Sequence, residues 1–540
     1  MRVLLSIVLA AGLPGMVQRD PAAQLASLVE EAQRAQARSD YRAAADAYRA
    51  AVSIHPELAQ LWSNLGVMRY ESHEYAGAEE ALKQALQRDK SLFVPNLFLG
   101  LDLLELKRPR EAAGYLLHAE KLSPDDPQVL LALGRAFHAL FDPARSRDWY
   151  QRAANVAPQS GDAWFGLGIS YLDMAERAGA RMATSFNRTA YFGQLSAESF
   201  ADQGRWREAI ERDRLLLNSE QESPQCSRTF YGWALLQSGE VREAAEQFEK
   251  DLDSCPLAPP AKARLASGAG DHSASLLPVS HSEEPLPAID KMSEQDLNSI
   301  ASKEFFSGHF GATARIADRL MREWPNDVTG WYWAVRAYQR LGIASLARAG
   351  EVEPDSPRIH ALLGEAYQRR KMSNEALQEY SRMLALQPDN IAGLAGLAAA
   401  YLQAGRLDEA QTAAQRALSK SPNDGEINLL MGEILVARRD YQRAEPYLEH
   451  GLHSRPDLVP RAHALLGRAL ARTGHPKEAI NELKKGVSSD DDGSVYYQLA
   501  RLYQSSGDTA AAATAFEKSQ QIRLRRGVVA SESDDASLDR

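Results

Sequence analysis

Cysteine is scarce in this 540-residue sequence, where only Cys226 and Cys255 occur. Because no cysteine precedes Cys226, a lipid anchor at a processed N-terminal cysteine is not expected. The sequence also has no Cys-x-x-Cys pair of the kind that binds structural zinc.

Catalytic signatures are missing as well. The sequence contains no phosphate-binding G-x-x-x-x-G-K-S/T, no H-E-x-x-H and no G-x-S-x-G. An enzyme hypothesis is therefore left without a named residue, and we predict a non-enzymatic protein that has no cofactor and no bound metal.

A positive charge excess is absent too. Lys and Arg number 62 against 72 Asp and Glu, a formal net charge of −10. A general nucleic-acid binder needs a basic surface that displaces counterions. The charge balance therefore favours protein or peptide partners over nucleic acid.

No apolar run is long enough to span a bilayer, so no integral membrane segment is expected. The longest candidate, from Val3 to Leu13, follows a single basic residue and precedes Pro14-Gly15. We interpret residues 1–20 as a signal peptide. The protein would then be exported to the periplasm or the extracellular space. The alternative is an N-terminal helix of a cytoplasmic protein.

A 34-residue periodicity runs through most of the chain. Steps of this length from Ala51 reach Ala85, Ala119 and Ala153. Equal steps from Pro56 reach Lys90, Pro124 and Pro158. A fixed period of this length indicates a repeat array.

The repeats share two sequence motifs. A W-x2-L-G-x2-Y opening is present as Trp164, Leu167, Gly168 and Tyr171, and an A-x3-Y-x2-A-x4-P ending as Ala44, Tyr48, Ala51 and Pro56. With these motifs the repeat resembles the tetratricopeptide family. Another copy keeps the spacing with Leu in place of Trp: Leu394, Leu397, Ala398, Tyr401, Ala410, Ala414, Ala417 and Pro422. The resemblance implies an all-α fold, a right-handed α-solenoid of stacked helix-turn-helix hairpins.

The motif positions divide the chain into two arrays. We expect about seven repeats over residues 25–256 and about seven over residues 291–526. The Pro-rich, aperiodic stretch 257–290 is interpreted as a linker, and residues 527–540 as a disordered tail. The expected repeats begin at Leu25, Ala59, Phe93, Pro127, Gly161, Ala190, Gln225, Glu294, Val328, Pro357, Ile391, Gly425, Pro460 and Gly493.

Two copies are short, because the steps from Gly161 to Ala190 and from Val328 to Pro357 each fall five residues short of the period. We predict a nearly continuous helix through each of them. Their matching positions indicate that the block from Glu294 duplicates the block from Pro127, although any two repeat arrays align at some offset.

Histidine and cysteine have structural interpretations. His450 and His453 lie three residues apart without a Cys or carboxylate cluster, so solvation or helix capping explains them better than metal binding. His360 and His463 fall where Trp stands in other repeats, which indicates packing. Cys226 and Cys255 lie at the two ends of one hairpin, where antiparallel helices bring them together, and are either a disulfide or two buried thiols.

In the tetratricopeptide family, the second, fifth, ninth and twelfth residues of a repeat line a concave groove. By this resemblance an apolar strip in the first array would bind a partner: Val94, Leu97, Leu101, Leu104, Phe165, Ile169 and Leu172. In the second array the corresponding residues are basic: Arg461, Arg468, Arg501 and, one residue out of register, Arg472. The alternative is that the strip is core and the arginines are solvated.

Taken together, these features predict an exported scaffold that binds other proteins. One alternative is the substrate-recognition arm of an enzyme complex such as a peptide-modifying glycosyltransferase. Another is an assembly factor for envelope machinery or polysaccharide export.

Overall fold

The computed structural model describes residues 21–202, 205–218, 223–267, 289–369 and 372–525. Within these ranges the chain forms 27 α-helices, two short 3₁₀ segments and no strand, which confirms the all-α prediction. The expected signal peptide at 1–20 and the tail at 527–540 lie outside the described residues.

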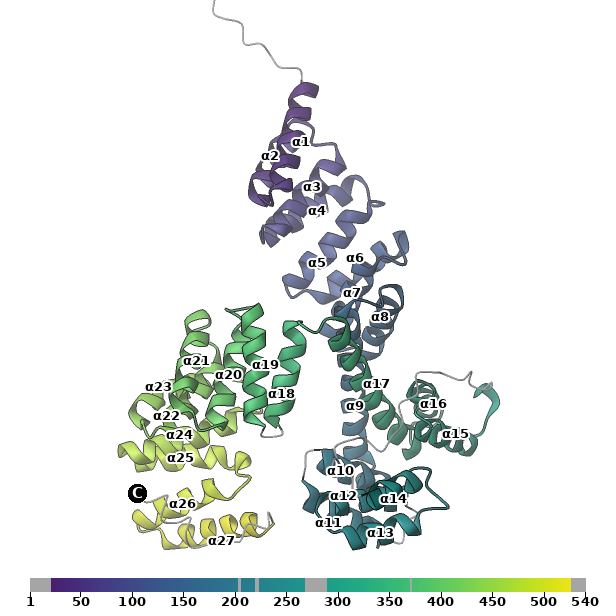
Figure 1. The fold of residues 1–540 in the computed structure, drawn as a ribbon. Coiled ribbons are helices and arrows are strands. Elements are labelled where there is room, and N and C mark those ends of the chain that lie inside the picture. The colour runs from purple at the N-terminus through teal and green to yellow at the C-terminus, as the bar shows by residue number, and fades with distance from the viewer. Residues whose placement is uncertain (1–20, 203–204, 219–222, 268–288, 370–371, 526–540) are drawn as a thin grey trace, which may run out of the picture. The chain divides into compact units, whose positions relative to one another are not determined.

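Two compact units make up the chain (Figure 1), and each is considered by itself. The first comprises residues 1–197 and 210–352, and the second residues 198–209 and 353–540. The first unit includes these helices: α1 (Pro21–Ala37), α2 (Tyr41–Ile54), α3 (Ala59–Glu71), α4 (Tyr75–Arg88), α5 (Phe93–Glu105), α6 (Pro109–Leu122), α7 (Pro127–Ala139), α8 (Pro143–Val156), α9 (Gly161–Ser185), α12 (Ser227–Gln237), α13 (Val241–Lys250), α14 (Ala258–Ser267), α15 (Glu294–Phe306), α16 (Phe310–Glu323) and α17 (Val328–Val352).

The boundary between the units falls within α10 (Ala190–Asp202), again within α11 (Trp206–Leu217), and after α17. The second unit contains five hairpins: α18 (Pro357–Arg369) with α19 (Ser373–Leu386), α20 (Ile391–Gln403) with α21 (Leu407–Lys420), α22 (Gly425–Ala437) with α23 (Tyr441–Gly451), α24 (Val459–Thr473) with α25 (Pro476–Gly486), and α26 (Ser494–Ser505) with α27 (Thr509–Arg525).

The first helix of each repeat, here called helix A, starts close to where the sequence predicts. In ten of the fourteen repeats it begins at the expected residue, and in the others within four residues. Acidic N-caps help to set these starts. The side chain of Asp126 accepts hydrogen bonds from the backbone N–H groups of Gln128 and Val129, and Asp424 does the same for α22.

Glycine at the eighth position of the repeat brings helix A against helix B, the second helix of the hairpin. A Cβ built on Gly100 would lie 2.4 Å from Cγ of Leu116, and one on Gly432 would lie 2.5 Å from Cδ2 of Leu448. The sequence spacing between glycine and leucine is the same in both pairs. The other pairs with this spacing are Gly66 with Leu82, Gly134 with Tyr150, Gly232 with Phe248, Gly364 with Tyr380 and Gly467 with Leu483.

The fourth residue of helix A ties its hairpin to the preceding loop. The indole Nε1–H of Trp164 donates to the carbonyl oxygen of Pro158 at 2.9 Å, and Asn428 Nδ2 donates to that of Pro422 at 2.9 Å. Both acceptors lie six residues earlier in the chain. Equivalent bonds join Trp62 to Pro56, Asn96 to Lys90 and Trp331 to Pro325. Trp and Asn are thus interchangeable here because each supplies an N–H donor.

The two short repeats form single 25-residue helices, α9 and α17, which confirms the prediction of nearly continuous helices. They lie side by side in the first unit (Figure 1) and run antiparallel. A Cβ on Gly168 would lie 2.6 Å from Cγ of Leu346, and one on Gly342 would lie 2.8 Å from Leu172. Each long helix therefore supplies the packing partner that the other one lacks.

The unit boundaries differ from the predicted arrays. Residues 258–267 of the expected linker form α14, and Leu257, Ala258 and Phe305 belong to one hydrophobic core with α9 and α17. Because α17 pairs with α9, residues up to Val352 join the first unit. The prediction that the folded chain divides at the Pro-rich stretch is therefore wrong. Residues 268–288 of that stretch lie outside the described residues.

Candidate functional site

On the first unit, charged side chains connect successive A helices. Arg135 of α7 forms an ion pair with Glu105 of α5 at 3.0 Å, and His138 of α7 contacts Asp173 of α9 at 3.2 Å. The hydrogen bond to Asp173 raises the pKa of the His138 imidazole. All four side chains are between about a third and a half exposed, so a partner that lies across α5, α7 and α9 would meet them.

The predicted apolar strip on α5 is largely core. Leu97 and Leu104 are 2% and 8% exposed and belong to a hydrophobic cluster with Leu133. The reason is that helix A contacts the A helices of the neighbouring repeats as well as its own helix B. Only Val94, 37% exposed, and the half-buried Leu101 are accessible.

The strip does not continue as a free surface along α9. Phe165 and Ile169 are half-buried. Leu172 packs against Gly342 of α17, and the assignment of Leu172 to a binding groove is therefore wrong. The sequence pattern misses this contact because α17 is distant from α9 in the chain, with seven other helices between them.

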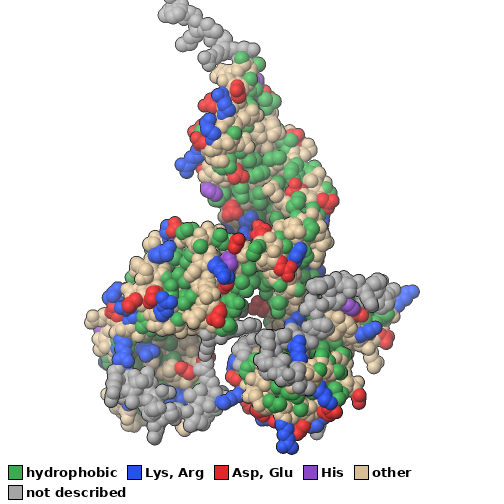
Figure 2. All heavy atoms as spheres, viewed as in Figure 1, with side chains coloured by type: hydrophobic (Ala, Val, Ile, Leu, Met, Phe, Trp, Pro, Cys, Tyr) green, Lys and Arg blue, Asp and Glu red, His purple; other side chains and the backbone are tan. Residues whose placement is uncertain are grey.

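Some apolar surface does remain on the first unit. On the face drawn in Figure 2, hydrophobic side chains gather over α3 to α7, with charged side chains toward the edges. Partly buried apolar residues, several of them aromatic, pack on the hydrophobic cluster that contains Leu97 and Leu133. The partly buried residues on the A helices are Tyr70, Phe93, Phe98 and Leu101, and Leu140 lies directly after α7.

The second unit carries a basic helix A surface. Helices α24 and α26 contain four arginines and no Asp or Glu. Arg461, Arg468 and Arg472 follow one another at seven and four residues and so share one side of α24. Arg501 has the corresponding place on α26, close to one repeat length after Arg468. We call these four residues the arginine face.

Most of the arginine face is accessible. Arg461, Arg472 and Arg501 are exposed and Arg468 is half-buried. Arg461 pairs with Glu433 of α22. The guanidinium groups of Arg468 and Arg501 form no ion pair with any residue that the structure describes. All four arginines thus lie on two neighbouring A helices.

Cys226 and Cys255 form a disulfide in the structure, with their Cα atoms 4.9 Å apart. Cys226 is the N-cap of α12, with a positive φ of 67°, and Cys255 lies in the turn between α13 and α14. Both are buried in the core that also holds Phe305 and Trp333. The bond ties the hairpin of α12 and α13 to the turn that leads into α14.

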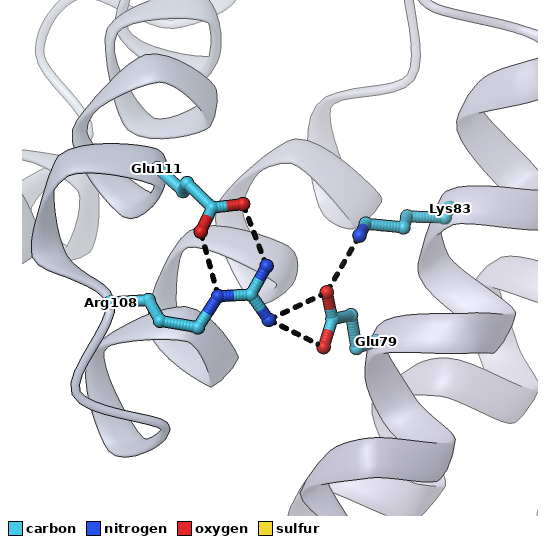
Figure 3. A network of polar contacts seen from close by, with 4 residues as sticks. All are labelled: Glu79, Lys83, Arg108 and Glu111. Carbon is cyan, nitrogen blue, oxygen red and sulfur yellow. Dashed lines mark hydrogen bonds and ion pairs between the residues drawn. The ribbon is translucent and has the colours of Figure 1, made fainter.

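A polar network joins the second and third hairpins (Figure 3). Glu79 of α4 accepts hydrogen bonds from Lys83 Nζ at 2.6 Å and from Arg108 Nη1 at 2.9 Å, while Arg108 also binds Glu111 with two hydrogen bonds. The hydrogen bond from Lys83 lowers the pKa of Glu79, although burial opposes this. Every member of the network has an opposite charge beside it, so we interpret it as structural.

Asp102 of α5 is fully buried, and neither of its carboxyl oxygens has a hydrogen-bond partner among the described residues. Burial raises the pKa of this carboxyl to about 7, and the negative charge of Glu79 adds to the effect. Asp102 was not predictable from the sequence, since nothing in its local pattern marks an acidic residue as buried.

Comparison with known families identifies the repeats. Models described as tetratricopeptide repeat match residues 29–92 and 99–163, residues 370–434 and 435–503, and residues 493–525. Together these matches cover more than half of the chain. The chain belongs to the tetratricopeptide repeat family. The models leave residues 164–369 unmatched, where the two long helices replace ordinary hairpins.

Solved structures of tetratricopeptide repeat proteins are similar to this chain at low identity. MamA from MSR-1 is 20% identical over 32% of this chain and 98% of its own, with a TM-score of 0.28. YrrB, described as having an unusual peptide-binding site, is 19% identical over 33% of this chain and 92% of its own, with a TM-score of 0.28. The Cut9–Hcn1 structure is 14% identical over 93% and 95%, with a TM-score of 0.32. No curated protein matches the chain.

Two tetratricopeptide repeats carry histidine at position four, and each pairs with a glutamate of its own helix B. His360 Nδ1 lies 2.7 Å from an oxygen of Glu379, and His463 Nδ1 lies 2.6 Å from one of Glu482. The sequence spacing is the same in both pairs, so the sequence carries a signal for this His–Glu contact. His450 contacts the carbonyl oxygen of Pro446, a residue of its own helix.

The described ranges contain no group of three or more His, Cys, Asp or Glu side chains that could hold a metal ion. Among the same residues no helix combines the length and the apolar character needed to cross a membrane.

The raised pKa of Asp102 predicts a pH-dependent stability. Since the folded state holds this proton up to about pH 7 and the unfolded chain releases it near pH 4, stability is lost as pH rises between these values. Asp102→Asn should therefore be stabilising, and by about 2 to 3 kcal/mol more at pH 8 than at pH 5. Urea unfolding followed by circular dichroism measures this.

The control is Asp125→Asn, an exposed carboxylate in the loop before α7, which should leave the pH dependence unchanged. If Asp102→Asn shifts the unfolding midpoint equally at both pH values, the carboxyl is not titrating as described.

Proposed function

We propose that this tetratricopeptide repeat protein is a non-enzymatic scaffold that binds other proteins through the exposed side chains of its A helices. The observation that carries the proposal is the arginine face of the second unit. The neighbouring helices α24 and α26 carry four arginines and no carboxylate. Packing does not require these arginines, because the core of these repeats is built largely from Ala and Leu.

The chemistry of the arginine face favours an acidic segment of a partner. A guanidinium group presents planar N–H donors that match a carboxylate in a two-point contact. Arg468 and Arg501 are the best placed for such contacts, because Arg461 already pairs with Glu433. Binding to partly exposed charges depends on ionic strength, since salt screens them.

The first unit would contribute a different kind of contact. Its A helices present half-buried aromatic and aliphatic side chains beside the pairs Glu105–Arg135 and His138–Asp173. A partner helix with apolar and charged sides matches this combination. The scaffold would then hold an amphipathic segment on one unit and an acidic segment on the other.

The proposal is tested with the full-length protein and a fluorescein-labelled octaglutamate peptide. Arg468→Gln combined with Arg501→Gln should weaken binding about tenfold at low salt, because two charge-assisted contacts are lost. The variant Lys477→Gln with Lys518→Gln removes the same charge from α25 and α27 and should bind like the wild type. Fluorescence anisotropy gives both affinities.

Equal weakening by both variants would mean that the peptide responds only to net charge, and the arginine face would lose its assigned role. The same conclusion follows if wild-type binding does not weaken when the salt concentration rises from about 50 to about 300 mM, given a Debye length of about 10 Å at 0.1 M.

We further infer that the protein works after export. The apolar run from Val3 to Leu13 supports this, and so does the disulfide, because such bonds persist in oxidising compartments. N-terminal sequencing of the protein from its native host should find a mature chain that starts beyond Leu13. A chain that still begins at Met1 would argue for a cytoplasmic scaffold.

A further inference from the structure

The arginine face has a defined edge. On α22, the A helix next to α24, the charged residues are Glu426 and Glu433, which pair with Arg455 and Arg461. An acidic ligand would be repelled by these glutamates and would therefore lie over α24 and α26. The favourable surface is thus confined to the last two hairpins.

The chain leaves the last hairpin close to this surface. Helix α27 runs antiparallel to α26, so its end lies beside the start of α26, where Ser519 Oγ donates to the carbonyl oxygen of Gly493 at 2.7 Å. The guanidinium of Arg523 lies 5.2 Å from the ring centre of Tyr497. Tyr497 stands one helical turn before Arg501 on α26.

The residues that follow are acidic. Between Arg526 and Arg540 the sequence contains four carboxylates and no Lys or Arg. The carboxylates are Glu532, Asp534, Asp535 and Asp539. We call residues 531–539 the acidic segment.

The acidic segment is within reach of the arginine face. Glu532 is seven residues beyond the end of α27, a span of up to about 23 Å for an extended chain. Neighbouring packed helices are about 8 to 10 Å apart, so both α26 and α24 fall within this distance. The nearest A helices are the basic ones, and the acidic α22 lies one helix further along the stack.

We propose that the acidic segment binds the arginine face of its own chain and competes there with acidic segments of partner proteins. The proposal rests on the proposed function of the arginine face. It makes partner binding autoinhibited: a partner gains access only when it displaces the segment, or when the segment is drawn away.

A weak contact is sufficient for this control. A short flexible connection gives an effective concentration of about 1 mM. A segment that binds with a dissociation constant of about 0.1 mM as a free peptide would then be roughly 90% bound within the chain. An external acidic peptide would need about ten times the concentration that it needs in the absence of the segment.

The experiment compares full-length chains. In one variant the segment is neutralised by Glu532→Gln, Asp534→Asn, Asp535→Asn and Asp539→Asn. The control carries four matching changes at exposed carboxylates outside α24 and α26: Glu478→Gln, Asp491→Asn, Asp508→Asn and Glu517→Gln. The probe is a fluorescein-labelled peptide with the sequence of residues 529–539, and its affinity is measured by anisotropy at low salt, about 50 mM.

The neutralised chain should bind the probe about tenfold more tightly than the wild type, and the control should bind like the wild type. Adding Arg468→Gln and Arg501→Gln to the neutralised chain should remove the gain. Circular dichroism should show the same helix content in every variant, since the changes at described positions lie on exposed or half-buried side chains.

Two results would overturn the proposal. If the neutralised chain and the control gain affinity equally, the effect is one of net charge. If the wild-type and neutralised chains bind both this probe and octaglutamate equally, the acidic segment does not occupy the surface, although the arginine face keeps its proposed function. Failure of octaglutamate to bind any of the chains would instead reject the proposed function itself.

Discussion

The close contact between the eighth residue of helix A and helix B is the constraint on which the repeat structure depends. At Gly100 and Gly432 a methyl group would overlap the leucine at the facing position of helix B. Interiors packed at this density tolerate little added volume. The contact sets how near the two helices of a hairpin lie, and hence which of their remaining side chains reach the next hairpin.

The middle of the chain shows what happens when the hairpin is lost. Helices α9 and α17 have no turn where the other repeats have one, so Gly168 has no helix B of its own to contact. It meets Leu346 of α17 instead, and Gly342 meets Leu172 in return. The same close contact is thus made between distant segments. This exchange brings α15 to α17 into the first unit and moves the boundary of the second unit to Glu353.

The sequence predicted local structure well and distant contacts poorly. The 34-residue period places most helix starts, and the two shortened steps predict both long helices. The same period cannot show which helix an unpaired long helix will meet. The family resemblance assigned Leu97 and Leu104 to a groove, because that assignment treats helix A as having one buried side, whereas neighbouring A helices bury a second.

The functional candidates can be divided in the same way, into residues that the local sequence predicts and residues whose surroundings depend on distant contacts. The arginine face was predictable because its residues are charged and recur at repeat positions that the core does not use. Asp102 was not, since its burial comes from the packing of α5 against its neighbours, and its local pattern resembles that of an exposed acid. Structural roles in this molecule belong to motif residues and their carbonyl or leucine partners, and the exposed arginines of the A helices have no such role in the packing.

The most direct test of this account compares Gly100→Ala with Gly114→Ala. Gly100 contacts Leu116, whereas a Cβ on Gly114 of α6, in the same hairpin, would have no atom within 4 Å. Gly100→Ala should destabilise the hairpin by about 1 to 3 kcal/mol. Gly114→Ala should instead stabilise it by about 0.5 to 1 kcal/mol, through the lower flexibility of alanine in the unfolded chain. Hydrogen exchange of α5 and α6 measures both effects, and equal protection in the two variants would contradict the account.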